Sequence, residues 1–356
     1  MRVLMLTADY PPCSWSGIGT AVRRQAQALA ELGAQVCVLV ARPPGRDGVE
    51  PAKTPGVEVL ALDRNRFPVR ARDFDVLHLH SLPLTELAFE LGRRFDLPLV
   101  ATVHALVQEE SEPSATLAFW VAVQARVLER SRRAVFLNRA ERDAAEARWP
   151  ALSTPMGRTV VIPGGLRTRS RAVSASPPAG PIVYAGRFAA SKGLDLLAEC
   201  LPAILERHPA NVVLAGGHAD AQGVRAVARI RESCGNRCTV RGWLEPEQLD
   251  DLFSTARLVL VPSRYEPCGQ VALEAMSLGA PVLAAAVGGL AEMISSGSGG
   301  RLVDSRDPGD WVDAALALLQ DDEARARLRR RGPVWVAKQY DIRVTARRLM
   351  EEAYAA

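Results

Sequence analysis

The chain has 356 residues, of which 48% are hydrophobic and 24% charged, and it carries a formal net charge of +4. This composition is that of a soluble globular protein of about two domains, and it excludes disordered, fibrous and small disulfide-rich proteins. The basic excess is too small and too dispersed for a dedicated nucleic-acid-binding protein. The six cysteines include no Cys-x-x-Cys pair, so we expect free thiols.

The opening residues bear on localisation. Residues 1–6 form an apolar run that passes directly into polar residues and is too short for the core of a signal peptide. No apolar run reaches the roughly eighteen residues of a transmembrane helix. We therefore expect a cytoplasmic protein.

Short apolar runs alternate with amphipathic stretches, a pattern typical of buried strands between helices. In the first half the predicted strands are residues 2–8, 35–41, 57–62, 75–80, 97–104, 134–138 and 159–163. Residues 20–32, between the first two, predict a helix from their apolar spacing. In the second half the predicted strands are residues 182–186, 212–217, 238–242, 258–262, 281–285 and 301–303. The alternation predicts two doubly wound α/β domains with parallel sheets.

A stretch rich in arginine, serine, alanine, proline and glycine separates the two halves and is interpreted as a linker. We expect a Rossmann-like domain over residues 1–166, the linker over 167–180, a second Rossmann-like domain over 181–335 and a helical segment over 336–356. Such sheets bind ligands beyond the carboxyl ends of their strands. Two of them facing each other would form a cleft, so residues directly after strands are the functional candidates.

Two glycines and three histidines occupy such positions in the first domain. Gly17 and Gly19 open the first helix, where backbone amides can approach an anion, although a tight turn alone would also explain them. His78 and His80 share one face of a strand by alternation, and His104 follows the next strand. A three-histidine metal site is conceivable, but no acidic partner has a suitable spacing. We expect no metal and a polar ligand contact from His104.

The second domain supplies charged candidates. Gly186 and Arg187 follow its first strand, and Lys192 comes five residues later, before a helix. A guanidinium and an ammonium beside a helix N-terminus suit a diphosphate, and Lys192 is one of only three lysines in the chain. Glu266 and Glu274 lie on either side of the start of a later helix, where they could bracket a ligand with several hydroxyls.

Residues 262–276 resemble the Glu-x7-Glu signature of the retaining glycosyltransferases of family 4, which have the GT-B fold. The resemblance covers nearly the whole chain and includes Thr102-Val103-His104, Gly186-Arg187 with Lys192-Gly193, and Arg241-Gly242-Trp243-Leu244. It implies that the segment 336–356 crosses back onto the first domain.

The same resemblance implies roles for single residues. Arg187 and Lys192 would bind the donor diphosphate and stabilise the leaving nucleotide. Glu266 and His104 would contact the transferred sugar, and Glu274 would hold the ribose hydroxyls. Further donor contacts are implied for Gly17 and Gly19 over the phosphates, for Arg241 and Trp243 beside the base, and for Gly186, Gly269, Gln270 and Val271.

The expected reaction is transfer of a sugar from a nucleoside-diphosphate-sugar, with UDP the first base to test, and without a metal or other cofactor. Retention is expected because an inverting enzyme needs a base opposite the leaving group, and residues 9–20 offer no histidine for that role. We expect a small soluble acceptor, with natural-product biosynthesis as the setting. The oligomeric state is not predicted.

Four alternatives stay open at this point. A membrane-associated lipid or polysaccharide glycosyltransferase could use the basic run Arg64, Arg66, Arg70 and Arg72. An inactive sugar-nucleotide-binding protein would keep the site without the reaction. A phosphorylase that uses pyridoxal phosphate would need Lys192 as its Schiff-base lysine. A hydrolysing epimerase would release nucleotide without any acceptor.

Overall fold

The computed structural model describes residues 1–12, 16–41, 51–62, 73–107, 114–152, 157–168, 180–217, 220–294 and 297–355. The chain divides into two compact units, of which unit 1 comprises Met1–Arg167 with Asp341–Ala356 and unit 2 comprises Thr168–Tyr340. Most of the predicted linker, and the basic run at 64–72, lie outside the described residues.

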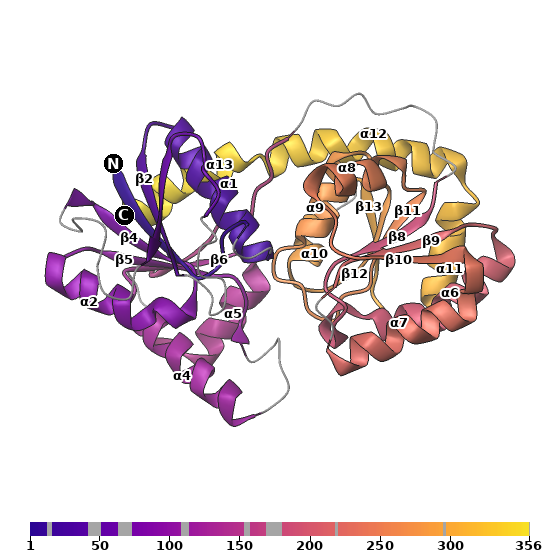
Figure 1. The fold of residues 1–356 in the computed structure, drawn as a ribbon, viewed down its shortest axis with the longest axis horizontal. Helices are drawn as coiled ribbons and strands as arrows, with labels where there is room; N and C mark the ends of the chain where they lie inside the picture. Colours follow the sequence, from indigo (N-terminus) through magenta and orange to yellow (C-terminus); the bar gives the residue numbers. More distant parts are fainter. Residues whose placement is uncertain are drawn as a thin grey trace. The chain divides into compact units, whose positions relative to one another are not determined.

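Unit 1 is built on a seven-stranded sheet in the order β3-β2-β1-β4-β5-β6-β7, and every pair of neighbouring strands is parallel. The strands are β1 (Arg2–Thr7), β2 (Gln35–Ala41), β3 (Val57–Leu62), β4 (Val76–Leu79), β5 (Leu99–Val103), β6 (Arg133–Phe136) and β7 (Thr159–Val161). The helices include α1 (Gly17–Glu31), α2 (Thr85–Phe95), α4 (Ala115–Arg130), α5 (Arg139–Arg148), α13 (Ile342–Arg348) and a closing π-helix (Leu349–Tyr354). Figure 1 shows them flanking the sheet.

Helices cover both faces of this sheet, which explains why its central strands are apolar almost throughout. Met5 of β1 packs in the cluster formed with α1 and the C-terminal helices, whereas Leu4 packs on the face of α2. Both side chains are fully buried. Alternation by two places His78 of β4 and Thr102 of β5 on the face that α1 and the C-terminal helices cover.

Unit 2 has a six-stranded parallel sheet in the order β10-β9-β8-β11-β12-β13. The strands are β8 (Ile182–Ala185), β9 (Val212–Ala215), β10 (Cys238–Arg241), β11 (Leu258–Val261), β12 (Val282–Ala285) and β13 (Gly300–Val303). The helices include α6 (Leu194–Arg207), α7 (Ala221–Cys234), α8 (Pro246–Thr255), α9 (Gln270–Ser277), α10 (Gly288–Met293), α11 (Pro308–Leu319) and α12 (Asp322–Gln339). Helix α6 packs against α7 and α11, whereas α9 packs against α8 and α12 (Figure 1).

The C-terminal segment belongs to the first unit, as the chain re-enters it at Asp341. Asp341 forms an isolated parallel bridge with Leu166, and α13 then packs against α1. The predicted start of this segment, residue 336, lies inside α12, which continues to Gln339. The predicted continuous helix is therefore interrupted, because the Asp341 side chain accepts a hydrogen bond from the Arg343 amide and caps a new helix there.

The predicted α/β fold with two parallel sheets is confirmed, and each predicted strand ends within two residues of an observed one. Among the described cysteines, Cys37, Cys200, Cys234 and Cys238 are free thiols as expected, while Cys13 lies outside the described residues. A search of the described residues finds no helix with the length and apolar character needed to cross a membrane.

Candidate functional site

The site in unit 2 begins with Lys192, which ends a single 3-10 turn (Ala190–Lys192) directly before α6. Gly193 follows with φ of 69°, a left-handed conformation that glycine adopts without strain. A Cβ at this glycine would overlap the carbonyl oxygen of Pro262, which follows β11. The glycine therefore lets the start of α6 pass directly against the end of β11, and it places Lys192 at the carboxyl edge of the sheet.

Glu266 is the centre of the polar contacts at this edge. Its Oε2 pairs with Lys192 Nζ at 2.9 Å and accepts a hydrogen bond from Ser263 Oγ at 3.2 Å, and its Oε1 accepts one from the Gly269 amide at 3.2 Å. The Lys192 and Glu266 side chains are only 19% and 16% exposed. An ion pair so largely withdrawn from water is screened less than a surface pair.

Gly269 marks the start of α9 with φ of 69°. The first amides of a helix have no intrahelical partner and carry the positive end of the helix dipole. Gln270, Val271 and Glu274 are half-buried on this helix, while Ala272 is fully buried. Glu266 thus contacts both the Gly269 amide at the start of α9 and the Lys192 ammonium.

Tyr184 and Asp220 connect Arg187 to the same edge. Burial raises the pKa of the Tyr184 phenol, the Glu266 charge raises it further, and the Arg187 charge opposes both. The Tyr184 hydroxyl donates to the Arg187 carbonyl at 2.6 Å. Burial by itself would raise the pKa of the Asp220 carboxyl. The net pKa is nevertheless lowered, because backbone amides such as that of Gly223 donate hydrogen bonds to the carboxylate and the Arg187 charge stabilises it. The Arg187 charge therefore acts on the same surroundings as Glu266, from an exposed position.

The ends of β9 and β10 form the other side of this edge. The Gly216 amide donates to the carbonyl oxygens of Arg241 and Gly242 at 3.2 and 3.3 Å. A Cβ at Gly217 would come within 2.9 Å of the Trp243 indole nitrogen. Trp243 is 46% exposed although it rests on this glycine. An exposed aromatic face of this kind can stack on a planar base.

In unit 1 the structure explains one glycine by packing. Helix α1 begins at Gly17 and is capped by Ser16, whose Oγ accepts a hydrogen bond from the Gly19 amide at 2.9 Å. A Cβ at Gly19 would come within about 3.0 Å of the Asp9 backbone. Gly19 is therefore needed for α1 to pack closely on the turn after β1. Contacts of Gly17 and Gly19 with donor phosphates stay a prediction.

The three histidines form a ladder on one face of β4 and β5, completed by a residue from the C-terminal π-helix. His78 Nε2 lies 2.8 Å from Thr102 Oγ1 and His78 Nδ1 lies 2.7 Å from the Tyr354 hydroxyl. One step further along, His80 Nδ1 lies 3.1 Å from His104 Nε2. The His78 and His80 rings lie 4.0 Å apart between centroids.

Burial keeps this ladder neutral. It lowers the pKa of His78 to about 3 and that of His104 to about 4, and it lowers the pKa of His80 well below its ordinary value. The rings contact one another and hydroxyl groups. Over the described ranges, no group of three or more His, Cys, Asp or Glu side chains is arranged to hold a metal ion.

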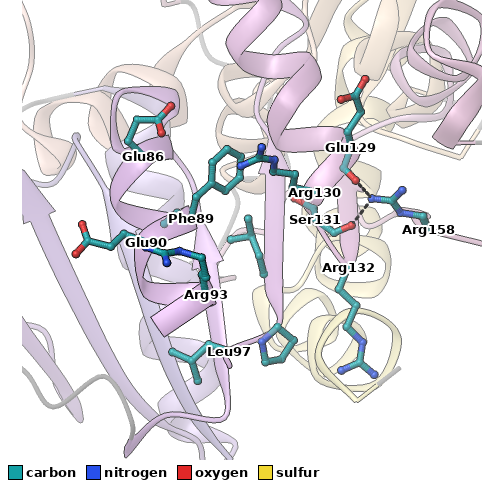
Figure 2. Close-up of a pocket in the computed structure, with 14 residues that line it drawn as sticks. Glu86, Phe89, Glu90, Arg93, Leu97, Glu129, Arg130, Ser131, Arg132 and Arg158 are labelled. Atoms are coloured by element: carbon teal, nitrogen blue, oxygen red, sulfur yellow. Dashed lines mark hydrogen bonds between the residues drawn. The ribbon is translucent and has the colours of Figure 1, made fainter. Parts of the chain in front are cut away.

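Unit 1 also has a groove (Figure 2), which lies away from the carboxyl ends of β4 and β5 where the histidine ladder is found. It runs along α2 and the end of α4, beside Pro98 and Leu99 at the start of β5, whereas His104 follows the end of that strand. Two of its four arginines have structural partners. The Arg130 guanidinium lies 4.7 Å from the Phe89 ring centroid, and Arg158 donates to the carbonyl oxygens that end α4 (Figure 2). The groove therefore belongs to the opposite edge of the sheet.

The structure thus brings together Lys192, Glu266 and Gly269, three of the residues singled out in the sequence, and it places Arg187 near them. Their contacts with a donor stay a prediction. It adds Ser263 and Tyr184, which the sequence analysis missed. Tyr184 lies within an apolar run and looks like an ordinary core residue. Its only sequence signal is a hydroxyl one position before the end of a strand.

In the comparison with known proteins, two separate family models match the two units of the chain. Residues 180–321 match the family model described as glycosyl transferases group 1, and residues 15–170 match the model described as glycosyltransferase family 4. The chain is 30% identical to a D-inositol 3-phosphate glycosyltransferase of Xylanimonas cellulosilytica over 92% of this chain and 90% of that protein. It is 27% identical to a glycogen synthase of Mycobacterium tuberculosis over 97% of this chain and 92% of that protein.

Solved structures share the fold. A sucrose-phosphate synthase from Thermosynechococcus elongatus superposes with a TM-score of 0.81 at 22% identity, covering 99% of this chain and 98% of the other. Anabaena HepE in complex with UDP and glucose gives a TM-score of 0.74 at 16% identity, with full coverage of both chains.

Two parallel Rossmann-like units with these structural relatives define a GT-B protein. The chain belongs to glycosyltransferase family 4, the group 1 glycosyltransferases, and it is a glycosyltransferase enzyme.

Proposed function

We propose that this enzyme transfers a sugar from a UDP-sugar to a hydroxyl group of a small soluble acceptor, with retention of configuration and without a metal. The observation that carries the proposal is the cluster of Lys192, Glu266 and Gly269 at the start of α9. An ammonium beside the N-terminus of a helix suits the negative charge that a nucleoside diphosphate develops as it leaves.

The chemistry follows from these groups. The bond between the anomeric carbon and the diphosphate oxygen breaks, and its electron pair goes to the diphosphate. Lys192, Arg187 and the first amides of α9 stabilise that charge, which is why we propose that no metal is required. The acceptor oxygen attacks from the face of the leaving group and its proton passes to the departing phosphate oxygen, so that configuration is retained.

Glu266 keeps the capacity to bind the transferred sugar. A carboxylate offers about four lone-pair positions, and two of those on Oε2 are used by Lys192 and Ser263, while one on Oε1 is used by the Gly269 amide. About one position on Oε1 is left for a sugar hydroxyl. Glu274 for the ribose and Trp243 with Arg241 for the base complete the proposed donor site.

The acceptor proposal draws support from the relatives. The Xylanimonas relative is named for D-inositol 3-phosphate, a small polyol, and it matches over most of both chains. The glycogen synthase relative supports a polysaccharide acceptor instead, at lower identity. We favour the small acceptor and place the enzyme in a cytoplasmic pathway for a glycosylated natural product.

Nucleotide binding tests the donor site directly. Thermal unfolding is measured with UDP, GDP, ADP and dTDP in the presence of EDTA. At about 100 times its dissociation constant, UDP should add about 3 kcal/mol of stability. No stabilisation by any nucleotide would contradict the proposed donor site. If only another nucleotide stabilises the protein, that nucleotide would replace UDP as the proposed carrier of the donor sugar.

Product analysis tests the rest of the proposal. The enzyme is incubated in EDTA with UDP-sugars and a panel of soluble polyols and their phosphates, and with glycogen as the polysaccharide comparison. We expect transfer to a soluble member of the panel, with the anomeric configuration of the donor preserved in the NMR coupling constant. An inverted product would overturn the proposed retention of configuration. Transfer to glycogen alone would overturn the proposed small soluble acceptor.

A further inference from the structure

The contacts within the ladder of unit 1 decide which ring nitrogen carries the proton in each of its three histidines. The Tyr354 side chain is buried, and His78 Nδ1 is its hydrogen-bond partner among the described residues. A buried phenol that did not donate would leave its O–H unsatisfied, so Tyr354 donates to Nδ1 of His78. The proton of neutral His78 is then on Nε2 and is donated to Thr102 Oγ1.

In the pair formed by His80 and His104, the proton of the strand residue is on the other ring nitrogen. His80 is 5% exposed, and its Nε2 is buried with no hydrogen-bond partner in the described part of the chain. A proton on Nε2 would therefore be an orphaned buried N–H group, which native structures rarely contain. The His80 proton belongs on Nδ1, from which it is donated to Nε2 of His104 at 3.1 Å. His104, accepting at Nε2, must carry its own proton on Nδ1.

The backbone after His104 is held independently of the rings. The Gln124 side chain of α4 donates to the Ala105 carbonyl at 2.9 Å and accepts from the Val107 amide at 3.2 Å. The Leu106 amide donates to Glu141 at 3.2 Å. Gln124 and Glu141 are both buried. With the loop held in this way, the orientation and proton position of the His104 ring depend on the contact with His80.

We propose that His80 is a positioning residue that holds His104 as the Nδ1–H tautomer, so that His104 offers a hydrogen-bond donor to a hydroxyl oxygen of the transferred sugar. The tautomer follows from the ladder alone. Only the assignment of that donor to the sugar rests on the proposed function. Without His80, the Nε2 of His104 would lose its donor, and the ring could take either tautomer and turn about its side-chain bonds.

NMR of the histidine rings tests the tautomer without any assay of activity. The chain has five histidines, so two-bond proton–nitrogen correlations of protein labelled with 15N-histidine at pH 7.5 are assignable with His78→Gln, His80→Asn, His104→Gln and His208→Gln, and the remaining signal is that of His218. We expect Nδ1–H on His80 and His104 and Nε2–H on His78. An Nε2–H tautomer on His104 in the wild-type protein would overturn the proposal, whatever the activity.

Two substitutions of His80 test the positioning. His80→Asn keeps an amide nitrogen near the place of Nδ1, whereas His80→Leu fills the space without a donor. We expect His104 to keep the Nδ1–H signature in His80→Asn and to become a mixture of tautomers in His80→Leu. An unchanged His104 spectrum in folded His80→Leu would show that His80 does not position it.

Kinetics then tests the link to the sugar. We expect kcat/KM to fall roughly 10-fold to 100-fold in His80→Leu, since small displacements of a positioned group have effects of this size, and to recover to within about threefold in His80→Asn. If His104→Ala keeps full activity, the proposed sugar contact fails while the NMR result still decides the tautomer. If no form transfers sugar, the proposed function fails and the spectra again decide the inference.

Discussion

The carboxyl edges of the two sheets are built by different means. In unit 2 a charged pair, Lys192 with Glu266, lies at a turn where glycines let backbone segments approach closely. In unit 1 the corresponding edge is a ladder of neutral rings and hydroxyls, in which side chains of neighbouring strands bond to each other. The same parallel architecture therefore supports two chemistries. One edge offers charge for an anion and the other offers neutral hydrogen bonds, which suit uncharged hydroxyls.

The largest expected effect tests whether charge is what distinguishes the edge of unit 2. Lys192→Ala should lower kcat by roughly 100-fold to 1000-fold, because one donor to the developing charge is removed. Steady-state kinetics with saturating donor and acceptor measures it. Lys338→Ala is the matched control, since this lysine is exposed on α12. Equal activities of the two variants would contradict the role given to the Lys192 ammonium.

The second prediction concerns Gly193 of unit 2, with Gly33 of unit 1 as its comparison. Gly193→Ala should cost about 3 kcal/mol, because the left-handed conformation and the overlap with the Pro262 carbonyl add together. This corresponds to about 6–12 °C in the melting temperature for a unit of this size. Gly33→Ala has a similar positive φ but open space around its Cβ, and it should cost only about 1 kcal/mol. Calorimetry of both variants separates overlap from conformation, and equal losses would show that close approach is unimportant.

The third prediction tests the neutrality of the ladder in unit 1. The folded-state pKa values of His78 and His104 are about 3 and 4, below the ordinary 6.5. The unfolded chain therefore binds protons first as the pH falls. The contribution of these groups is full above about pH 6.5 and is lost from there down to about pH 4 for His104 and about pH 3 for His78. Each histidine should remove roughly 1 kcal/mol per pH unit from the stability of unit 1 in this window.

Hydrogen exchange of peptides from β4 and β5, corrected for intrinsic rates at pH 7.5, 6 and 5, measures this loss. His80→Asn should show a shallower dependence because one buried histidine is gone, while His208→Gln in unit 2 should leave it unchanged. Hydrogen bonds from Arg2 and Arg348 lower the pKa values of Asp75 and Glu352. Those carboxyls lose their contribution only at lower pH. Identical slopes in wild type and His80→Asn would contradict the neutral ladder.

The strands of both sheets, and the residues around Glu266 in the site of unit 2, could largely be predicted from local sequence patterns. The strands are apolar and short because both faces of each sheet are buried, so runs such as residues 35–41 were located closely. Glu266 and Gly269 were also located, since they lie three positions apart at the start of a predicted helix, whereas Ser263 in the same loop was missed. Their hydrogen bonds are set by a turn and a helix start, which are local structures.

What the sequence by itself determined is therefore the order of strands and helices, the positions at strand ends and the chemical type of the groups placed there. The tertiary structure decided which of these groups are paired. Lys192 meets Glu266 across 74 residues, and His78 meets Tyr354 across 276. It also decided that the chain re-enters unit 1 at Asp341. The physical reason is that sheet register and helix packing bring distant residues together, and burial then sets which protons and charges can be accommodated.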